Sequence, residues 1–405
     1  MNKSKNLLAF GLVAALGFAA CGSDDDADEP ASTEAADDAV TTDAAADDTA
    51  TTDAMTDDTA TTDAMTDDTA TTDAMTDDTA TTDAATDDTP TDAAGSGDIC
   101  EVTDTGGVDD KGFNQIAFEG AETVAAELGV EAKVLESTSD ADFAPNIQSF
   151  LDEDCGLIVT VGFLLGDATA EAANNNPDQP FAIIDSGFDP PIDNVLTLNF
   201  SVAEPSYLAG YLAAGMTETG TVATYGGINI PPVTVFMDGF VKGVEKYNEV
   251  KGTDVVALGW DGTDGTFAGN FENLDDGKNI ASSFADEGAD IIFPVAGPVG
   301  LGSSAYATEN EGIRIIGVDA DMYLQNPADA PVYLVSVLKN IDAAVIAAGQ
   351  QVIGEGTVGG EYIGTLENGG VGLSEFHDQE GDVPDELKAE IEDLQAQFVS
   401  GELTL

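Results

Sequence analysis

The chain has 405 residues, with 78 Asp and Glu against 11 Lys and Arg, for a formal charge of −67. A polyanion of this size repels nucleic acid and acidic lipid headgroups, because binding to either needs Lys and Arg to neutralise phosphates. A single histidine, His377, and three cysteines disfavour a His-rich zinc site, a Cys/His nucleophilic pair and a Ser-His-Asp triad, and with them most hydrolase mechanisms.

The chain begins with a predicted export signal that ends in a lipidation motif. Residues 1–21 combine two early lysines with an apolar run over residues 7–16 and small residues before Cys21. The apolar run is too short to cross a bilayer. Cys21, followed by Gly and Ser, resembles the bacterial lipobox, so we expect its Sγ to carry diacylglycerol and to anchor the protein to the outer face of the plasma membrane. Ordinary signal cleavage near Ala20 is the alternative.

Residues 22–97 are predicted to form an acidic tether. They hold 24 acidic residues and no Lys or Arg, and a ten-residue repeat of Thr, Asp and Ala is clearest over residues 41–90. Stacked copies of this repeat would bury almost no apolar side chain, so a solenoid is excluded and disorder is predicted. A flexible chain of this length spans roughly 50 Å, and repulsion between like charges extends it further.

The remaining residues, 98–405, keep a strong negative charge of about −45, from 54 acidic and nine basic residues. Because the acidic residues are spread along the whole segment, we favour adaptation to a salty medium, in which screening removes the self-repulsion. A field that attracts cations is the alternative.

After residue 97 the pattern changes to short apolar runs that alternate with amphipathic stretches. The strands are expected at residues 99–102, 132–135, 157–161, 181–184, 195–198, 221–225, 255–258, 291–295, 313–318 and 332–337. The helices are expected at residues 114–128, 144–151, 167–174, 204–215, 233–247, 275–287, 301–310, 341–353 and 384–399. Continuous apolar strands separated by helices indicate parallel sheets covered on both faces, which is a doubly wound α/β fold.

Two such series predict two lobes with a hinge and a central cleft. We place the N-terminal lobe at residues 98–217, with a later crossover segment near 338–370, and the C-terminal lobe at 218–337. Residues 371–405 are expected to carry a tail helix with Pro384 at its first position. Ligands of open α/β sheets bind at the carboxyl ends of the strands, so the strand-end loops of both lobes should surround the cleft.

A disulfide is predicted between Cys100 and Cys155. Each cysteine lies at or just before the start of a predicted strand, and in a parallel sheet the starts of neighbouring strands lie side by side. An exported protein also meets an oxidising medium. Two buried free thiols are the alternative.

The loop over residues 103–115 is the densest candidate site. Its glycines allow tight turns, and its aspartates can cap the helix that follows. It lacks the spacing of a phosphate-binding loop. Phe113 beside Asn114 suits a neutral ring instead, because an aromatic side chain can stack on the ring while an amide bonds its edge. The alternative is a capped helix with Phe113 in the core.

Four further positions follow predicted strands. Asp167 is either a helix cap or a carboxylate that accepts a ring N–H, and Gly297 lets backbone N–H groups approach a ligand. Asp319 suits a vicinal diol, because a carboxylate can accept two hydrogen bonds. Lys339 is a candidate second hydroxyl contact, or the partner of Asp319 in an ion pair.

These positions fall within motifs that resemble the basic membrane protein family, the lipoprotein substrate-binding components of ABC transporters. The motifs are D-x-G-G-V-D-D-K-x-F-N-Q-x-A-F-E-G at 104–120, V-G-F-x-x-x-D-A at 161–168, F-A-I-I-D at 181–185, E-x-S-Y-L-A-G-Y-x-A-A at 204–214, G-A-D-I-I-F-P-V-A-G at 288–297, I-G-V-D-A-D at 316–321 and S-V-L-K-N at 336–340. The resemblance covers residues 99–372, about two-thirds of the chain. It implies a type I periplasmic-binding fold that holds a nucleoside, in several members a purine nucleoside, between two aromatic rings.

The resemblance also implies roles for the candidate residues. Phe113 would stack on the base, Asn114 and Asp167 would bond its edge, and Asp319, Lys339 and the Gly297 region would hold the ribose. The second stacking ring falls in the segment 259–271, where Phe267 is the first choice. Phe271 and Trp260 are the alternatives.

The leading interpretation is an extracytoplasmic binding lipoprotein with no catalytic activity, cofactor or metal. It would capture a nucleoside, close its lobes and present the ligand to an ABC permease with its ATPase, acting as a monomer. The alternatives are another neutral polar ligand, such as a sugar, or a ligand-sensing surface lipoprotein. A nucleoside hydrolase with Ca²⁺ in the acidic segment 261–276 is disfavoured, because the D-x-D-x-D-G spacing is absent.

Overall fold

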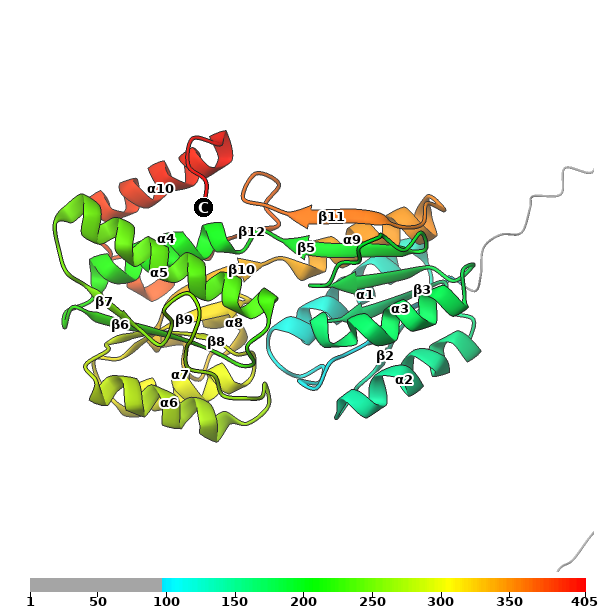
Figure 1. Cartoon of the computed structure of the whole chain (residues 1–405), viewed down its shortest axis with the longest axis horizontal. Helices are drawn as coiled ribbons and strands as arrows, with labels where there is room; N and C mark the ends of the chain where they lie inside the picture. The colour runs from blue at the N-terminus through cyan, green and yellow to red at the C-terminus, as the bar shows by residue number, and fades with distance from the viewer. Residues whose placement is uncertain (1–96) are drawn as a thin grey trace, which may run out of the picture. The chain divides into compact units, whose positions relative to one another are not determined.

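The computed structural model describes residues 97–405, and within them the chain forms two α/β lobes (Figure 1). The predicted signal, Cys21 and all but the last residue of the predicted tether lie outside the described residues. Each lobe is built on a six-stranded sheet. In the part of the chain that the structure describes, no helix combines the length and the apolar character needed to cross a membrane.

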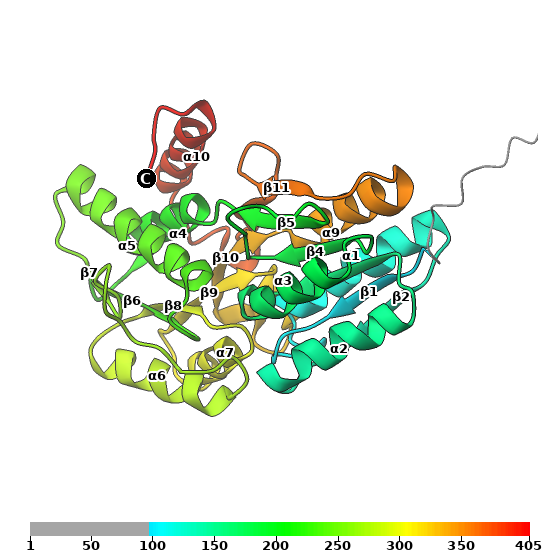
Figure 2. The same ribbon diagram turned by 45° about the vertical axis from the view of Figure 1, so that its right-hand side comes forward.

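The first lobe contains an all-parallel sheet with the strand order β11-β5-β4-β3-β1-β2. Its strands are β1 (Ile99–Val102), β2 (Ala132–Leu135), β3 (Leu157–Val161), β4 (Phe181–Ile184), β5 (Val195–Phe200) and β11 (Gly360–Gly364). Its helices are α1 (Phe113–Leu128), α2 (Asp140–Asp152), α3 (Gly166–Asn175) and α9 (Ile341–Gly349). Helices cover both faces of this sheet (Figure 2), with α1 and α9 packed on one core cluster and α2 and α3 on another. Every residue of β1, β3 and β4 is therefore buried.

The second lobe has the strand order β12-β10-β9-β8-β6-β7, in which only the β10–β12 pair is antiparallel. Its strands are β6 (Thr221–Gly226), β7 (Val256–Leu258), β8 (Ile291–Val295), β9 (Arg314–Asp319), β10 (Tyr333–Lys339) and β12 (Val371–Leu373). Its helices are α4 (Ala203–Met216), α5 (Pro231–Lys251), α6 (Leu274–Asp286), α7 (Val299–Glu309), α8 (Met322–Gln325) and α10 (Asp385–Ser400). The two lobes thus have the doubly wound architecture that the alternation of strands and helices predicts.

Helix α4 belongs to the second lobe, although the sequence places it in the first. It packs along α5 so closely that a side chain on Gly210 would lie 2.0 Å from the Phe240 carbonyl oxygen, and one on Gly243 would lie 2.0 Å from the Tyr207 carbonyl oxygen. The tail helix α10 covers the same helix, with Tyr207 and Phe398 in edge contact at 5.3 Å. The chain therefore changes lobes just after β5, about fifteen residues before the predicted boundary.

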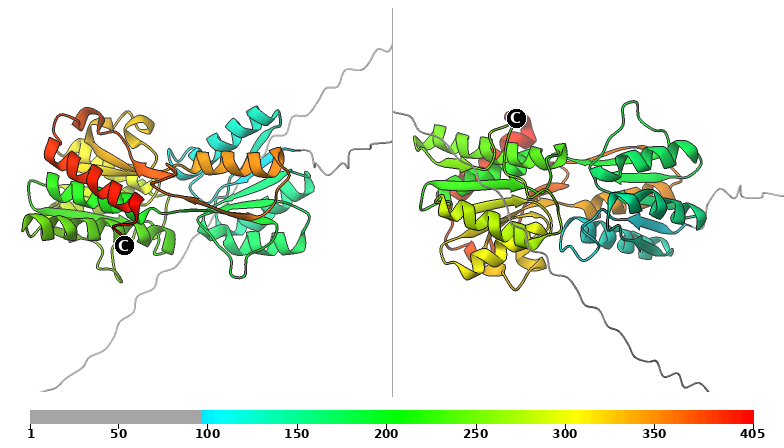
Figure 3. Two further views of the ribbon diagram at one scale, coloured as in Figure 1. Left: turned by 90° about the horizontal axis from the view of Figure 1, so that it is seen from above. Right: turned by 60° about the horizontal axis from the view of Figure 1, so that its bottom comes forward.

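Three connections cross between the lobes: β5 to α4, β10 to α9, and β11 to β12. Figure 3 shows these segments running between the two lobes, with α9 returned to the first lobe. The crossings are bonded to each other, because the Ser201 N–H donates to the Gly364 carbonyl at 2.8 Å and the Asn340 N–H donates to the Gly370 carbonyl at 2.9 Å. Connections gathered in this way are typical of a hinge.

The predicted disulfide is confirmed. Cys100 on β1 and Cys155, two residues before β3, are bonded, with their Cα atoms 6.2 Å apart. The register pairs Ile99 with Leu157, which brings the starts of these parallel strands together. Both cysteines are buried in the core between the sheet and helices α2 and α3.

Candidate functional site

An interlobe cavity lies at the carboxyl ends of the strands; its empty space, including the part open to solvent, is about 620 Å³. The first lobe contributes the loops after β1, β3 and β4, and the second contributes the ends of β8, β9 and β10 together with the start of α5. Five of the predicted site residues line this cavity, namely Phe113, Asn114, Gly297, Asp319 and Lys339. Asp167, Phe267 and Trp260 do not.

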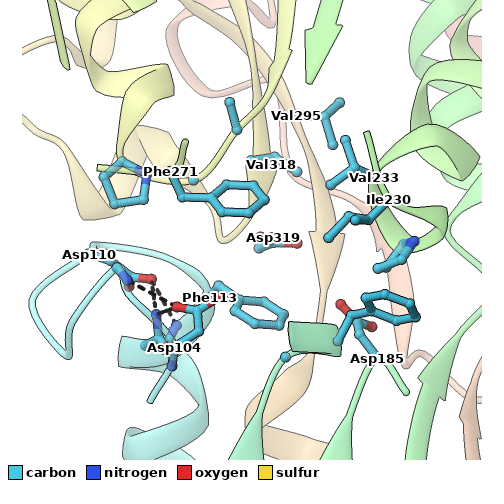
Figure 4. A pocket seen from close by; sticks show the side chains of 18 of the residues that line it. Asp104, Asp110, Phe113, Asp185, Ile230, Val233, Phe271, Val295, Val318 and Asp319 are labelled. Atoms are coloured by element: carbon cyan, nitrogen blue, oxygen red, sulfur yellow. Dashed lines mark hydrogen bonds between the residues drawn. The ribbon is translucent and has the colours of Figure 1, made fainter. Parts of the chain in front are cut away.

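Two aromatic rings face the cavity from opposite lobes. Phe113 begins α1 in the first lobe, and Phe271 lies in the loop before α6 in the second; Figure 4 shows their rings facing one another across the cavity. Phe271 packs closely on Gly227, where a Cβ atom would come within 2.2 Å of its ring. A planar ligand could therefore insert between one ring from each lobe.

The first choice for the second ring, Phe267, is wrong, because this residue does not line the cavity. A bridge pairs it with Gly226 at the end of β6, and its ring packs edge-on against Trp260 at 6.0 Å. Trp260 itself is buried and donates from Nε1 to Asp238 Oδ1 at 2.7 Å. Phe267 and Trp260 thus pack into the core of the second lobe, and Phe271 is the ring of this segment that lines the cavity.

The predicted contact of Asp167 with the base is also wrong, because this residue does not line the cavity. It lies on the exposed face of the first turn of α3. After β3, the residues that reach the cavity are Gly162, Phe163 and Leu164, and a short 3-10 turn (Phe163–Leu165) then carries the chain away into α3. The alternative, a helix cap, is not met either, because the N-cap is Leu165 and no side chain bonds the cap; Asp167 is the acidic residue of the first turn.

Asn114 lines the cavity, but its amide is fully occupied within the protein. Nδ2 donates to Asp104 Oδ1 at 2.8 Å and to Asp110 Oδ2 at 3.1 Å, while Oδ1 accepts from the Asp104 N–H at 3.2 Å. With 1% of its surface exposed, Asn114 holds the loop and orients Asp104. In this conformation, Asn114 cannot form the predicted bidentate contact with the edge of a base.

Asp104 instead offers a free oxygen to a ligand. Its Oδ1 accepts from Asn114 and from the Gly106 N–H at 3.0 Å, whereas its Oδ2 has no hydrogen-bond partner among the described residues. Burial raises the pKa of Asp104 to about 6, even though these hydrogen bonds favour the ionised form. Asp104 was not predicted from the sequence, although it lies two residues after β1 and opens the first motif.

Asp110 caps helix α1. Its two carboxylate oxygens accept from the backbone N–H groups of Gly112, Asn114 and Gln115 at 2.9, 2.9 and 3.1 Å. This arrangement satisfies the free N–H groups of the first turn and places negative charge at the positive end of the helix dipole. The cap fixes Phe113 and Asn114 at the cavity wall, so capping and cavity lining occur together here.

Three further charged residues line the cavity: Asp319, Lys339 and Asp185. Asp319 ends β9 with a positive φ of 64°, and its Oδ1 is buried without a partner among the described residues. Burial raises the pKa of Asp319 to about 7, although the nearby Lys339 ammonium opposes the shift. An unpaired buried acceptor of this kind is costly unless a ligand supplies a donor.

Lys339 forms its ion pair with Asp185 of the first lobe rather than with Asp319. The ammonium is 2% exposed and lies 4.9 Å from the centroid of the Phe113 ring. Asp185 follows β4 directly, so the rule of strand carboxyl ends could have found it from the motif F-A-I-I-D. Burial raises the pKa of Asp185 even though the ammonium of Lys339 favours its ionised form.

The chemistry of the cavity is acidic, with Asp104, Asp110, Asp185 and Asp319 against the single ammonium of Lys339. Within residues 97–405, no group of three or more His, Cys, Asp or Glu side chains is arranged to hold a metal ion. The site can therefore accept hydrogen bonds from an uncharged ring and a polyol.

Comparison with known proteins decides the family. The family model described as "ABC transporter substrate-binding protein PnrA-like" matches residues 99–404. The chain belongs to this Bmp family. Bmp proteins are the extracytoplasmic substrate-binding components of ABC transporters and are not an enzyme class.

Individual Bmp relatives agree with this placement. The chain is 31% identical over 327 residues to the ABC transporter nucleoside-binding protein BmpA of Lactococcus lactis, covering 75% of this chain and 87% of the relative. It is also 31% identical over 278 residues to an uncharacterised lipoprotein of Pyrococcus furiosus, covering 66% of this chain and 68% of the relative. The crystal structure of an ABC transporter solute-binding protein from Aeropyrum pernix superposes with a TM-score of 0.68 at 27% identity, covering 76% of this chain and 92% of that one. The type I periplasmic-binding architecture is thereby confirmed.

Proposed function

We propose that this Bmp protein captures nucleosides, with a preference for purines, and delivers them to an ABC permease. The observation that carries the proposal is the pair of rings, Phe113 and Phe271, which line the same cavity as the unpartnered carboxylate oxygens of Asp104 and Asp319. Stacking on a base is worth about 1–3 kcal/mol per ring contact and suits any flat heterocycle. The name of the Lactococcus relative supports the same ligand class.

The carboxylates and the lysine of the cavity suit different parts of a nucleoside. Asp104 Oδ2 can accept from a ring N–H or an amino group of the base. Asp319 can accept from both hydroxyls of the ribose diol, and Lys339 can donate to a ribose oxygen. A larger purine covers more of the facing rings than a pyrimidine does, which is the basis for the expected preference.

The charge of the cavity disfavours phosphorylated ligands. Lys339 is already paired with Asp185, and no arginine lines the cavity walls. A phosphate would lie among carboxylates without the Arg forks that usually hold it. We therefore expect nucleosides to bind and nucleotides to bind weakly.

Cys21 and the tether would keep this function at the cell envelope. The lipidation motif predicts a lipid anchor on the outer face of the plasma membrane, and Bmp relatives from Pyrococcus are named lipoproteins. Replacing Cys21 with Ser should move the protein from the membrane fraction to the medium or the soluble envelope fraction. A Cys21→Ser protein that stays in the membrane fraction would contradict the anchor.

Calorimetry tests the ligand class. The chain from residue 22 onward is titrated in high salt with adenosine, guanosine, inosine, cytidine, AMP and a panel of sugars. Nucleosides should bind, purines most tightly, and AMP at least tenfold more weakly than adenosine. Heat with a sugar and none with any nucleoside would assign the cavity to a sugar instead.

Ring substitutions test the site assignment. Phe113→Ala and Phe271→Ala should each weaken nucleoside binding by about 1–3 kcal/mol, because each removes a stacking partner. Phe267→Ala is the matched control, because that ring lies in the same segment but packs on Trp260. A larger loss in Phe267→Ala than in Phe271→Ala would reverse our choice of the second ring.

A further inference from the structure

A second space, the side groove, adjoins the interlobe cavity. Its empty space, including the part open to solvent, is about 630 Å³. The groove shares four wall residues with the cavity: Phe163, Asp185, Pro232 and Lys339. Its remaining walls come from both lobes and are Ser186, Gly187, Asn199, Phe200, Val202, Pro231 and Val235. The groove is thus separated from the proposed nucleoside site only by residues that face both spaces.

The order of residues along the cavity indicates which end of a ligand meets the groove. In Figure 4, Asp104 and Asp110 lie on one side of the Phe113 ring and Asp185 lies on the other. A base whose edge meets Asp104 therefore directs its sugar toward Asp185 and Lys339. Asp319 lines the cavity but not the groove. When Asp319 binds the ribose diol, the 5′ carbon of the ribose therefore points toward the wall residues that the cavity shares with the groove.

The chemistry of the side groove favours an uncharged, largely apolar group. Its two charged residues, Asp185 and Lys339, are paired with each other. The ring of Phe163 is 40% exposed at the boundary, and Phe200, Pro231 and Val235 add apolar surface. The polar groups that remain, on Ser186 and Asn199, are neutral. Burying an alkyl group against this surface is favourable, whereas a phosphate would find no unpaired cation.

We propose that the side groove is a subsite for nucleosides that carry an uncharged substituent, such as an alkylthio group, on the 5′ carbon. This inference rests on the proposed function, because it requires a nucleoside in the interlobe cavity. It goes further in naming a second ligand class that the same protein accepts. A substituent in the groove would be in contact with both lobes.

Titration of the chain from residue 22 onward tests the proposal directly. Adenosine and inosine are compared with their 5′-deoxy-5′-methylthio and 5′-deoxy-5′-isobutylthio analogues. We expect the methylthio compounds to bind at least as tightly as the parents. The isobutylthio compounds should bind more tightly, by about threefold to fourfold for each methylene that becomes buried. Analogues that bind tenfold more weakly than their parents would overturn the subsite.

Groove-filling variants identify where the substituent binds. A side chain on Gly187 would meet no atom within 4 Å, and its φ is not positive, so Gly187→Trp can occupy the groove without strain. Val235→Trp fills the groove from helix α5 on the facing lobe. Gly381→Trp is the matched control, because that glycine is exposed, equally free of neighbours and remote from the groove.

Both groove variants should weaken binding of the isobutylthio analogues at least tenfold and leave the parent nucleosides within threefold of the wild type. An equal loss for parents and analogues would show that the groove is only an entrance, which overturns the proposal. Absence of binding by every parent nucleoside would overturn the proposed function instead, and the subsite with it.

Discussion

At the scale of single residues, the site depends on buried carboxylates that the sequence shows only as part of a general excess of acid. Asp104 and Asp319 each keep one oxygen without a protein partner among the described residues, and both have a raised pKa, about 6 and about 7 respectively. Burial is the main cause in both cases. Ligand binding should therefore depend on pH near neutrality.

The first prediction concerns this pH dependence. A ribose diol donates both of its hydrogen bonds only to ionised Asp319, so nucleoside affinity should fall as the pH drops below about 7. The limit is about tenfold per pH unit while one proton must be released. Isothermal titration between pH 8.5 and 5.5 measures the effect, and Asp319→Asn should bind weakly with a flatter profile. Asp167→Asn, an exposed carboxylate near the cavity, should behave as the wild type does. Affinity that stays constant from pH 8 to pH 6 would contradict the role given to Asp319.

The second prediction concerns Glu101, which points from β1 into the core beneath α1. Its side chain is fully buried, both of its oxygens lack partners among the described residues, and burial, assisted by Asp110, raises its pKa well above the usual range. The folded state then holds a proton that the unfolded state has released, so stability is lost as the pH rises above the ordinary glutamate pKa. Glu101→Leu should raise the free energy of unfolding by about 1–3 kcal/mol at pH 8 and by less at pH 5.

Urea unfolding at the two pH values measures this difference. Glu122→Leu, on the exposed side of α1, is the control and should show no pH-dependent gain. A Glu101→Leu protein that is less stable than the wild type at pH 8 would show that the carboxyl has a partner that the structure does not contain.

At the scale of elements, strands with a clear apolar run could be predicted from the sequence, including the edge strands β2 and β7, whereas the edge strands β11 and β12 could not. β1, β2, β3, β4 and β8 have the predicted bounds, because four of them are continuous buried runs and β2 lies between clear turns. β11 was missed because it begins and ends with glycine and is mostly exposed, and β12 has only three residues. Apolar periodicity carries no signal for elements of this kind.

The lobe to which helix α4 belongs could not be predicted from the sequence either. Helix α4 is apolar on all sides, with ten of its 14 residues buried, so its pattern does not say which sheet it covers. The sequence pattern was limited in the same way for the residues of the candidate site. Phe113 and Asp319 were found because Phe113 lies where a strand-end loop meets its helix and Asp319 lies at the end of a strand. Phe267 and Phe271 are two rings in one loop, and only their packing separates them.

The third prediction tests the close contact of α4 and α5. Alanine normally stabilises a helix by about 1 kcal/mol over glycine, but a Cβ atom at Gly243 would lie 2.0 Å from the Tyr207 carbonyl oxygen. Gly243→Ala should therefore destabilise the protein by about 1–3 kcal/mol through overpacking. Gly300→Ala in α7, where the nearest atom is at 3.4 Å, should be neutral or stabilising. Equal effects of the two substitutions in thermal unfolding would refute the contact.

At the scale of the whole molecule, the charge is the dominant property. Residues 98–405 carry about −45 with nine cations. Six of these cations form ion pairs with carboxylates: Lys133, Lys246, Lys251, Lys278, Lys339 and Lys388. Self-repulsion on this scale opposes compaction unless salt screens it.

The fourth prediction follows from this charge. Raising the ionic strength from about 0.1 M to 1 M shortens the Debye length from about 10 Å to about 3 Å, so the free energy of unfolding should rise. Urea unfolding in NaCl and in choline chloride measures the effect, and similar gains in both salts would identify screening. A gain in NaCl alone would indicate specific cation binding, and a loss of stability in both would contradict the prediction.

The ion pair of Lys339 and Asp185 links the two lobes directly. Lys339 ends β10 in the second lobe, immediately before the crossing at Asn340, and Asp185 follows β4 in the first. Lys111 of the first lobe adds a second bridge, to the Gln325 carbonyl of the second at 3.3 Å. Because these contacts already hold the lobes together, the ligand does not have to supply all the free energy of closure, and its affinity is higher. Release of the ligand then requires the contacts between the lobes to be broken. The permease would then have to do work on the protein as well as on the cargo.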